Sequence, residues 1–132
     1  MPVEPGAEQF AELTTLAGGE GDGPVVMLNL NRYRDRDAYM RYGAVASAVL
    51  ERVGGRVLWH TDSSGTVIGG DAEVYDEVIA VWYPSLAAFK ELATDPELLA
   101  AREHRLAGLQ GAELICCAAG DQAGALSSEL QR

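Results

Sequence analysis

Two asparagines interrupt the most hydrophobic run of the chain, and their amides are the first groups with binding chemistry. The run is 24–31, Pro-Val-Val-Met-Leu-Asn-Leu-Asn. Because side chains in a strand alternate between two faces, Asn29 and Asn31 share one face with Met27 and leave the other face aliphatic. A buried amide without partners costs about 1–3 kcal/mol, so these amides belong to a polar network or line a wet cavity. In a cavity, either amide can orient a carbonyl or enolate oxygen.

Arg105 is a cation on an apolar helix stripe. The helix predicted from Pro96 has its stripe at spacings of three, four and four residues, at Leu98, Ala101, Arg105 and Leu109. A guanidinium stays charged, so Arg105 needs an acceptor, and Asn29, Asp76 or a substrate oxygen can serve. Arg105 is therefore either a substrate-binding group or an internal clamp between helix and sheet.

The two histidines are the candidates for proton transfer near neutral pH. His60 lies in a predicted strand beside Trp59, and His104 precedes Arg105 but points about 100° away around the helix. Each is a candidate general acid or base, catalytic if it borders the same cavity. The alternative is a satisfied polar group at a strand end for His60 and a partly exposed helical residue for His104.

Aromatic residues supply flat apolar area that suits an aromatic ligand. Trp59, Trp82 and Tyr83 are such residues, and we take Tyr83 as a candidate substrate contact, with core or dimer packing as the alternative for all three. The glycine pairs lack dinucleotide or P-loop spacing, and no nucleophile elbow is present. The cysteines and histidines lack metal-ligand spacing, so we expect no metal and no cofactor.

Composition narrows the class of protein. With 132 residues, 48% of them hydrophobic, the chain is expected to form one domain. A net charge of −10 opposes nucleic-acid binding, and no apolar run is long enough for a membrane span. No secretory signal is visible, and the adjacent Cys116 and Cys117 fit a reducing compartment. We therefore expect a cytoplasmic protein without nucleic-acid or membrane partners.

The elements that must position these residues follow from apolar spacing and turn residues. A short N-terminal helix on Phe10, Leu13 and Leu16 precedes an alternation of strands and helices. Expected strands are 24–32, 56–61, 77–83 and 113–118; expected helices begin at Asp35 or Asp37, at Pro84-Ser85 and at Asp95-Pro96, the last running to Ala107. This divides the chain into an N-terminal extension (1–23), a domain (24–118) and a C-terminal tail (119–132).

The order β-α-β-β-α-β predicts an α+β, ferredoxin-like protomer with an antiparallel four-stranded sheet and helices on one face. The other face must meet water or a partner. Val25, Met27, the third strand and the segment 114–117 make that face too apolar for water. We therefore expect a homodimer in which two sheets form a dimeric α/β barrel. Which strand face meets the helices stays open, because both faces of the third strand are apolar.

An ordered set of short segments resembles a known family. The segments are Pro24–Leu30, Tyr39–Tyr42, Gly54–Arg56, Ile68–Gly70, Asp76–Val78, Tyr83–Ser85 with Phe89, Asp95–Glu97, His104-Arg105 and Ala107–Leu109. Over roughly residues 8–118 the chain resembles the bacterial family named domain of unknown function thirteen-thirty, of the dimeric α/β-barrel superfamily. That resemblance implies a ferredoxin-like protomer and a dimer. The superfamily includes cofactor-independent monooxygenases, polyketide cyclases, haem enzymes and stress-response domains, and no histidine here matches an axial haem ligand.

Three functional hypotheses remain. The first is a small cofactor-independent enzyme that binds an aromatic or polyketide-like molecule and assists proton transfer in cyclisation, isomerisation or oxygenation. In it, Asn29 and Arg105 polarise an oxygen while His60 or His104 moves a proton. The second is a non-catalytic small-molecule-binding or accessory protein, and the third is a structural dimerisation module.

Overall fold

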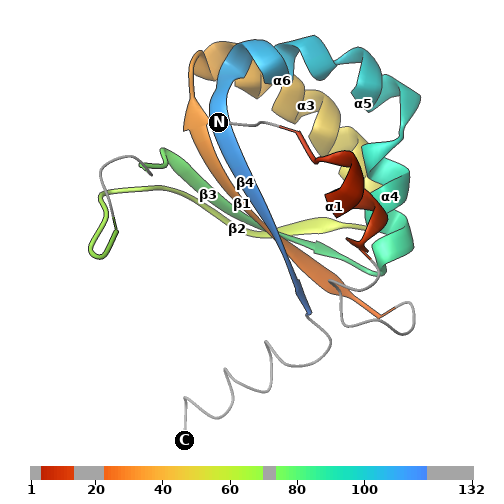
Figure 1. Ribbon diagram of the computed structural model, residues 1–132. Coiled ribbons are helices and arrows are strands. Elements are labelled where there is room, and N and C mark those ends of the chain that lie inside the picture. The colour runs from red at the N-terminus through yellow and green to blue at the C-terminus, as the bar shows by residue number, and fades with distance from the viewer. Residues whose placement is uncertain (1–3, 14–22, 70–73, 119–132) are drawn as a thin grey trace, which may run out of the picture.

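A four-stranded antiparallel sheet with helices on one face forms the protein (Figure 1). The computed structural model describes residues 4–13, 23–69 and 74–118. Its strands follow the order β2-β3-β1-β4, and every pairing is antiparallel. The predicted ferredoxin-like α+β fold is confirmed. The elements are α1 (Ala7–Ala11), β1 (Val25–Tyr33), α3 (Arg36–Arg52), β2 (Arg56–Asp62), β3 (Glu77–Tyr83), α4 (Leu86–Ala93), α5 (Pro96–Ala100), α6 (Arg102–Gly108) and β4 (Leu109–Ala118).

Side-chain caps fix where the helices begin. The Asp35 carboxylate accepts a hydrogen bond from the Ala38 N–H at the start of α3, and Ser85 does the same for Ala88 in α4. Asp95 caps α5, with Pro96 at its first position. The single helix predicted over Pro96–Ala107 is interrupted at Ala101, whose φ of −90° and ψ of 1° separate α5 from α6. Ala101 is buried, so tertiary packing rather than helix propensity sets this bend.

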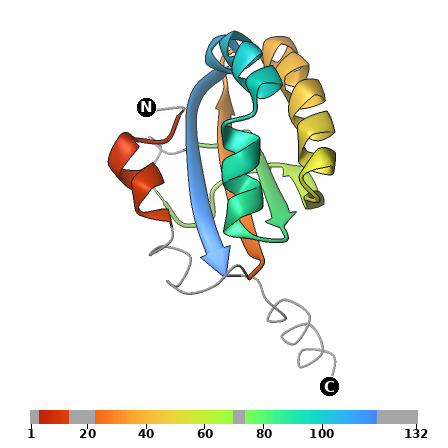
Figure 2. The same ribbon diagram turned by 90° about the vertical axis from the view of Figure 1, so that its right-hand side faces the viewer.

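The core lies between the sheet and the helices, which Figure 2 shows in front of the strands. Val25 and Met27 face this side and are buried, so the expectation that they belong to the open face is wrong. Tyr83 packs edge-on against Phe89 of α4, with ring centroids 5.2 Å apart. The odd-numbered residues of β1 therefore form its inner face.

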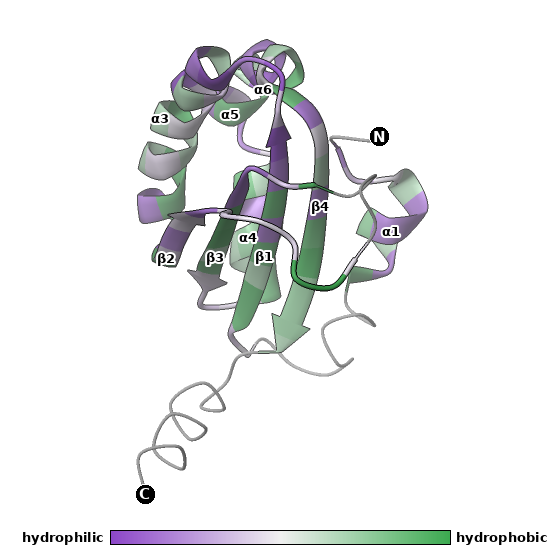
Figure 3. Ribbon diagram, turned by 90° about the vertical axis from the view of Figure 1, so that its left-hand side faces the viewer, coloured by the Kyte–Doolittle hydropathy of each residue, from purple (hydrophilic) through white to green (hydrophobic). Residues whose placement is uncertain are grey.

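Figure 3 looks onto the opposite, outer face of the sheet. Residues directly opposite each other in neighbouring strands share a face. Trp59, Ala80, Leu28 and Ile115 are paired in this way across β2, β3, β1 and β4. Trp59 and Ile115 are 49% and 44% exposed, so the outer face carries an apolar row open to solvent.

Several boundaries differ from the predicted ones. β4 starts at Leu109 rather than Glu113, because its first residues pair with the end of the long β1, including Tyr33 opposite Leu109. In the N-terminal helix, Phe10 and Leu13 pack against the core, whereas Leu16 and the predicted tail 119–132 lie outside the described residues. The division into extension, domain and tail stays a prediction.

No helix in the described part of the chain is both long enough and apolar enough to cross a lipid bilayer.

Candidate functional site

The inner face of the sheet changes from apolar to polar along the strands. Its first row pairs Val57, Val81, Met27 and Cys116 across the four strands. The second row pairs His60, Ile79, Asn29 and Leu114, and the third pairs Asp62, Glu77, Asn31 and Ala112. Polar groups thus gather at the end of the sheet where β1 finishes and β3 begins.

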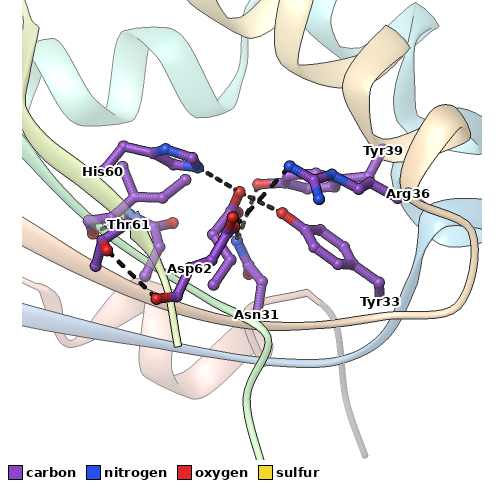
Figure 4. Close-up of polar contacts among 10 residues, drawn as sticks. Asn31, Tyr33, Arg36, Tyr39, His60, Thr61 and Asp62 are labelled. Atoms are coloured by element: carbon purple, nitrogen blue, oxygen red, sulfur yellow. Dashed lines mark hydrogen bonds and ion pairs between the residues drawn. The ribbon is translucent and has the colours of Figure 1, made fainter. Parts of the chain in front are cut away.

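At that polar end, a buried carboxylate gathers hydrogen-bonding partners from two strands, β1 and β2 (Figure 4). Glu77 is only 2% exposed. Its Oε1 accepts a hydrogen bond from Asn31 Nδ2 at 2.8 Å, and its Oε2 accepts a short one from the Tyr33 hydroxyl. His60 Nε2 lies 2.7 Å from the same Oε2. Burying a carboxylate costs free energy unless hydrogen-bond donors surround it, and these three contacts meet that need.

The neighbouring tyrosines stay protonated over the physiological range. Burial raises the pKa of the Tyr33 phenol, and the hydrogen bond to Glu77 raises it further. Burial is also the main cause that raises the pKa of Tyr39 to about 12. The Tyr39 hydroxyl accepts a second hydrogen bond from Asn31 Nδ2 at 3.0 Å. Both phenols are therefore neutral groups that orient the asparagine and the carboxylate.

His60 connects this cluster to solvent. Its side chain is 44% exposed although its partner Glu77 is buried. With Nε2 directed at the carboxylate, exchange of a proton with any bound molecule falls to Nδ1. A carboxylate that accepts from one ring nitrogen fixes the tautomer and stabilises the imidazolium, which is the role of the acidic member of a catalytic triad.

Backbone contacts hold the start of α3 against the polar end. The carbonyl of Gly108 accepts hydrogen bonds from the N–H groups of Arg34 and Asp35, at 2.8 and 3.1 Å. A side chain at Gly108 would place its Cβ 2.5 Å from the Tyr39 backbone nitrogen. Only glycine allows this approach, which brings Tyr39 within reach of Asn31. Asp76 adds a second brace, because its carboxylate accepts from the Tyr33 N–H at 2.8 Å.

A cavity of about 700 Å³ lies beside the cluster, bounded by the sheet, the helices and the N-terminal segment. Its wall is mostly apolar, with Met27, Ile79, Leu50 and Leu98 among the lining residues. Ile79 is paired with His60, and Tyr42, which also lines the cavity, lies 6.0 Å from the Tyr39 ring. A second space of about 420 Å³ shares several of these lining residues. Volumes of this size suit small-molecule ligands.

Three of the predicted ligand-binding residues line this cavity. Asn29 does so while its amide donates to the Met27 carbonyl at 3.2 Å. Arg105 lines both spaces, and its guanidinium lies 5.4 Å from the Tyr42 ring centroid. Tyr83 lines the larger space, although it is buried against Phe89. The acceptors expected for Arg105 were Asn29, Asp76 or a substrate oxygen, whereas the structure brings its guanidinium to the Tyr42 ring.

The other predicted residues divide between the cluster and the helices. Asn31 and His60 both contact Glu77, so the structure brings them together. His104 belongs to α6, where its N–H donates to the Ala101 carbonyl. Within the described part of the chain, His104 lines neither space and contacts none of the cluster residues by a hydrogen bond.

Glu77 and Tyr33 were missed by the sequence analysis, and both had a detectable signal. Glu77 has the same strand parity as Ile79 and Val81, so strand alternation alone places its carboxylate on the same face as these apolar residues. Tyr33 continues the parity of Asn29 and Asn31 by one step. Both were overlooked because they stand at strand ends, where polar residues usually meet solvent. Among the described residues, no group of three histidine, cysteine or acidic side chains could hold a metal ion.

Residues 25–118 match the family described as domain of unknown function (DUF1330). The chain therefore belongs to that family, as the resemblance indicated. A protein of unknown function from Rhodopseudomonas palustris, RPA0582, is 35% identical; the match covers 86% of this chain and 93% of that chain, with a TM-score of 0.77. No curated protein matches the chain at a significant level.

More distant solved structures share the fold alone. SnoaB, a cofactor-independent oxygenase from Streptomyces nogalater, is 17% identical, and the match covers 75% of this chain and 94% of that chain, with a TM-score of 0.52. A hydroxynitrile lyase from Passiflora edulis is 12% identical, with coverage of 73% and 93% and a TM-score of 0.54.

Proposed function

We propose that this protein is a small cofactor-independent enzyme that transfers a proton on an aromatic or polyketide-like molecule during cyclisation, isomerisation or oxygenation. One observation carries the proposal: His60, held by the buried Glu77, is paired in the sheet with Ile79, and Ile79 lines an apolar cavity of about 700 Å³. Removal of an acidic C–H proton requires at least a positioned base beside a space that holds the substrate.

The proposed chemistry needs only groups of this chain. His60 Nδ1 accepts the proton as the C–H bond breaks, and the electron pair stays on the substrate as an enolate. Glu77 stabilises the resulting imidazolium through Nε2, which it already contacts at 2.7 Å. Asn29 and Arg105, both on the cavity wall, stabilise the enolate oxygen. Tyr33 and Asn31 are positioning residues, because they hold the carboxylate by hydrogen bonds.

The shared fold adds support by analogy. SnoaB is a cofactor-independent oxygenase, so a protomer of this architecture can carry chemistry without a cofactor. At 17% identity the comparison transfers no residue and no substrate to this chain. The proposal therefore depends on the His60–Glu77 pair and on the cavity.

Hydrogen–deuterium exchange tests the proton transfer directly without a known product. The protein is incubated in D₂O with a panel of enolisable aromatic and polyketide-like ketones, and loss of the α-proton signal is followed by NMR. We expect accelerated exchange for at least one compound, reduced about 100-fold in His60→Gln, since general-base catalysis contributes about 10²–10⁴-fold. His104→Gln is the matched control and should keep the wild-type rate.

A non-catalytic binding protein is the second candidate, because the donors to Glu77 are satisfied within the cluster and leave no group there that requires a ligand. The same experiment separates the two. Ligand-induced shifts without exchange across the whole panel would eliminate the enzyme and leave the binding protein. Exchange that is as fast in His60→Gln as in the wild type would eliminate His60 as the base.

We also propose a homodimer in the cytoplasm. The apolar row on the outer face, with Trp59 and Ile115 nearly half exposed, supports burial against a second copy. Cys116 and Cys117 are both free thiols, which supports a reducing compartment. Sedimentation of wild type and of Trp59→Glu tests the dimer, which the glutamate should dissociate. A compact wild-type monomer at micromolar concentration would contradict it.

A further inference from the structure

The net charge of the cavity wall has the opposite sign to that of the whole chain. The sequence has twice as many acidic as basic residues, 20 against 10. Among the described residues that line the larger cavity, however, the charged ones are two arginines, Arg102 and Arg105, and a single carboxylate, Glu4. The rest of that wall is mostly apolar. A locally cationic cavity in an anionic protein indicates selection for a negative group inside it.

The single carboxylate comes from the N-terminal segment and is bound to one of the arginines. Glu4 Oε1 and Oε2 accept from Arg102 Nε and Nη2, at 2.5 and 2.8 Å, in a two-pronged geometry. The hydrogen bond to Arg102 holds the pKa of the Glu4 carboxyl below its usual range, and the nearby charge of Arg105 acts in the same direction. Glu4 is thus an ionised carboxylate held at the point where the two arginines meet the cavity.

Arg105 lies where the two cavity spaces meet. It lines both the 700 Å³ and the 420 Å³ spaces, and Glu4 lines both as well. Its guanidinium is oriented by Tyr42, whose ring centroid it approaches at 5.4 Å and whose phenol it contacts by a hydrogen bond. A guanidinium is permanently charged and planar, so Arg105 adds a second positive charge beside the Glu4 carboxylate.

We infer that the cavity binds an amphipathic anion, an aromatic or acyl molecule with a carboxylate or sulfonate-like group, and that Glu4 occupies the anion subsite between Arg102 and Arg105 until such a ligand replaces it. The apolar wall takes the body of the ligand. This refines the ligand class of the proposed function and rests on the same cavity. The N-terminal segment, with Phe10 against the core, is then a built-in competitor for the anionic group.

Two fluorescent probes with one scaffold test the anion subsite. Anilinonaphthalene sulfonate and N-phenylnaphthylamine share their aryl-amine body, and only the first is anionic. Their Kd values are measured by fluorescence titration of the full chain at low ionic strength. In Glu4→Gln we expect the anionic probe to bind about threefold more tightly, since one competing ion pair is removed. In Arg105→Met it should bind about tenfold more weakly, because a charge-assisted hydrogen bond is lost. The neutral probe should keep its wild-type Kd in both variants.

Matched controls make the result specific. Glu8→Gln changes an exposed carboxylate of the nearby helix α1, and Arg41→Met changes an exposed arginine of α3. Neither residue lines the cavity in the described part of the chain, so both variants should bind the probes like the wild type. Ala46→Trp fills the cavity and should weaken both probes together. Anionic-probe binding that survives Ala46→Trp would show a surface site and overturn the inference.

Two further outcomes would also overturn the inference. One is unchanged or weaker binding of the anionic probe to Glu4→Gln, and the other is unchanged binding of that probe to Arg105→Met. The proposed proton transfer fails separately. His60→Gln should bind both probes normally and lose only deuterium exchange, so binding and catalysis are read by different measurements.

Discussion

The two ends of the inner sheet face are equally buried but are held by different forces. Met27 at the apolar end and Asn31 at the polar end are both 1% exposed, four residues apart on the same strand face. Met27 is held by dispersion and hydrophobic burial, which tolerate changes of shape. Asn31 is held by hydrogen bonds to Glu77 and Tyr39, which fail if one partner is lost. Equal burial therefore implies different sensitivity to substitution, and that difference can be measured.

Removing the carboxylate should break the polar end most severely. Glu77→Ala strips Asn31, Tyr33 and His60 of their shared acceptor in a buried site. We expect the free energy of unfolding to fall by about 3–5 kcal/mol, the usual result when one member of a buried polar network is removed. Urea denaturation followed by circular dichroism measures the loss.

Two companion variants distinguish the loss of the hydrogen-bond network from the effect of replacing any glutamate in the sheet. Glu77→Gln keeps the shape and one acceptor, so its loss should be about 1 kcal/mol. Glu113→Ala removes an exposed carboxylate from β4 and should stay within about 0.5 kcal/mol of the wild type. If Glu77→Ala were as stable as Glu113→Ala, the cluster would not support the fold.

Truncating the apolar end should cost less, about 2–3 kcal/mol for Met27→Ala. The substitution removes buried methylene groups, but it also enlarges a space that already adjoins Met27, so little close packing is lost beyond the transfer energy. Met27→Leu conserves volume and should cost under about 1.5 kcal/mol. The same denaturation measurement applies. A larger loss for Met27→Ala than for Glu77→Ala would reverse the ranking of the two ends.

The sequence predicts the fold well because alternation and capping are local signals. The mostly apolar run 25–30, the Asp35 cap and the Asp95-Pro96 start each specify an element through their immediate neighbours. Strand parity alone could not say which face of β1 meets the helices, since β3 is apolar on both faces. The break at Ala101 was also hidden, because alanine favours a continuous helix and only tertiary packing bends it there.

The candidate site was predictable in part for a related reason. Asn31 and His60 were recognised by residue type, yet their partner Glu77 is recognisable only once register places the three strands side by side. The N-terminal Glu4 lies 98 positions from Arg102 along the chain, so no spacing in the sequence connects them. Long-range pairs of this kind need the fold before they can be named.

Substitutions at two separate glycines, Gly108 and Gly43, test how closely α3 is held at the polar end. Gly108→Ala would bring a Cβ to 2.5 Å from the Tyr39 nitrogen and displace the start of α3, at a cost of about 2 kcal/mol from overpacking. Gly43→Ala, inside the same helix, meets no atom within 4 Å and should stabilise the protein by about 0.5–1 kcal/mol. Thermal unfolding of both variants should therefore shift in opposite directions. Shifts of the same sign would show that the Gly108 contact does not constrain α3.

Alkaline pH should destabilise the protein through its buried phenols, at either end of the sheet face. The pKa of Tyr39 rises to about 12 because it is buried, whereas an unfolded tyrosine has a pKa of about 10. Between these values the folded state keeps a proton that the unfolded state releases. The free energy of unfolding therefore falls as pH rises through this window, by about 1.4 kcal/mol per pH unit for each such phenol.

Single replacements identify which phenols carry that slope. Burial likewise raises the pKa of Tyr83 at the apolar end. Tyr39→Phe and Tyr83→Phe should each remove one phenol's contribution to the pH dependence of the unfolding free energy between pH 10 and 12. Below pH 9, Tyr39→Phe should change the unfolding free energy by only about 1 kcal/mol, because Asn31 loses one acceptor. Urea titrations across this range read the slope. A slope that is unchanged in Tyr39→Phe would mean that this phenol ionises in the folded state as it does in the unfolded chain, and burial at the polar end would not protect it.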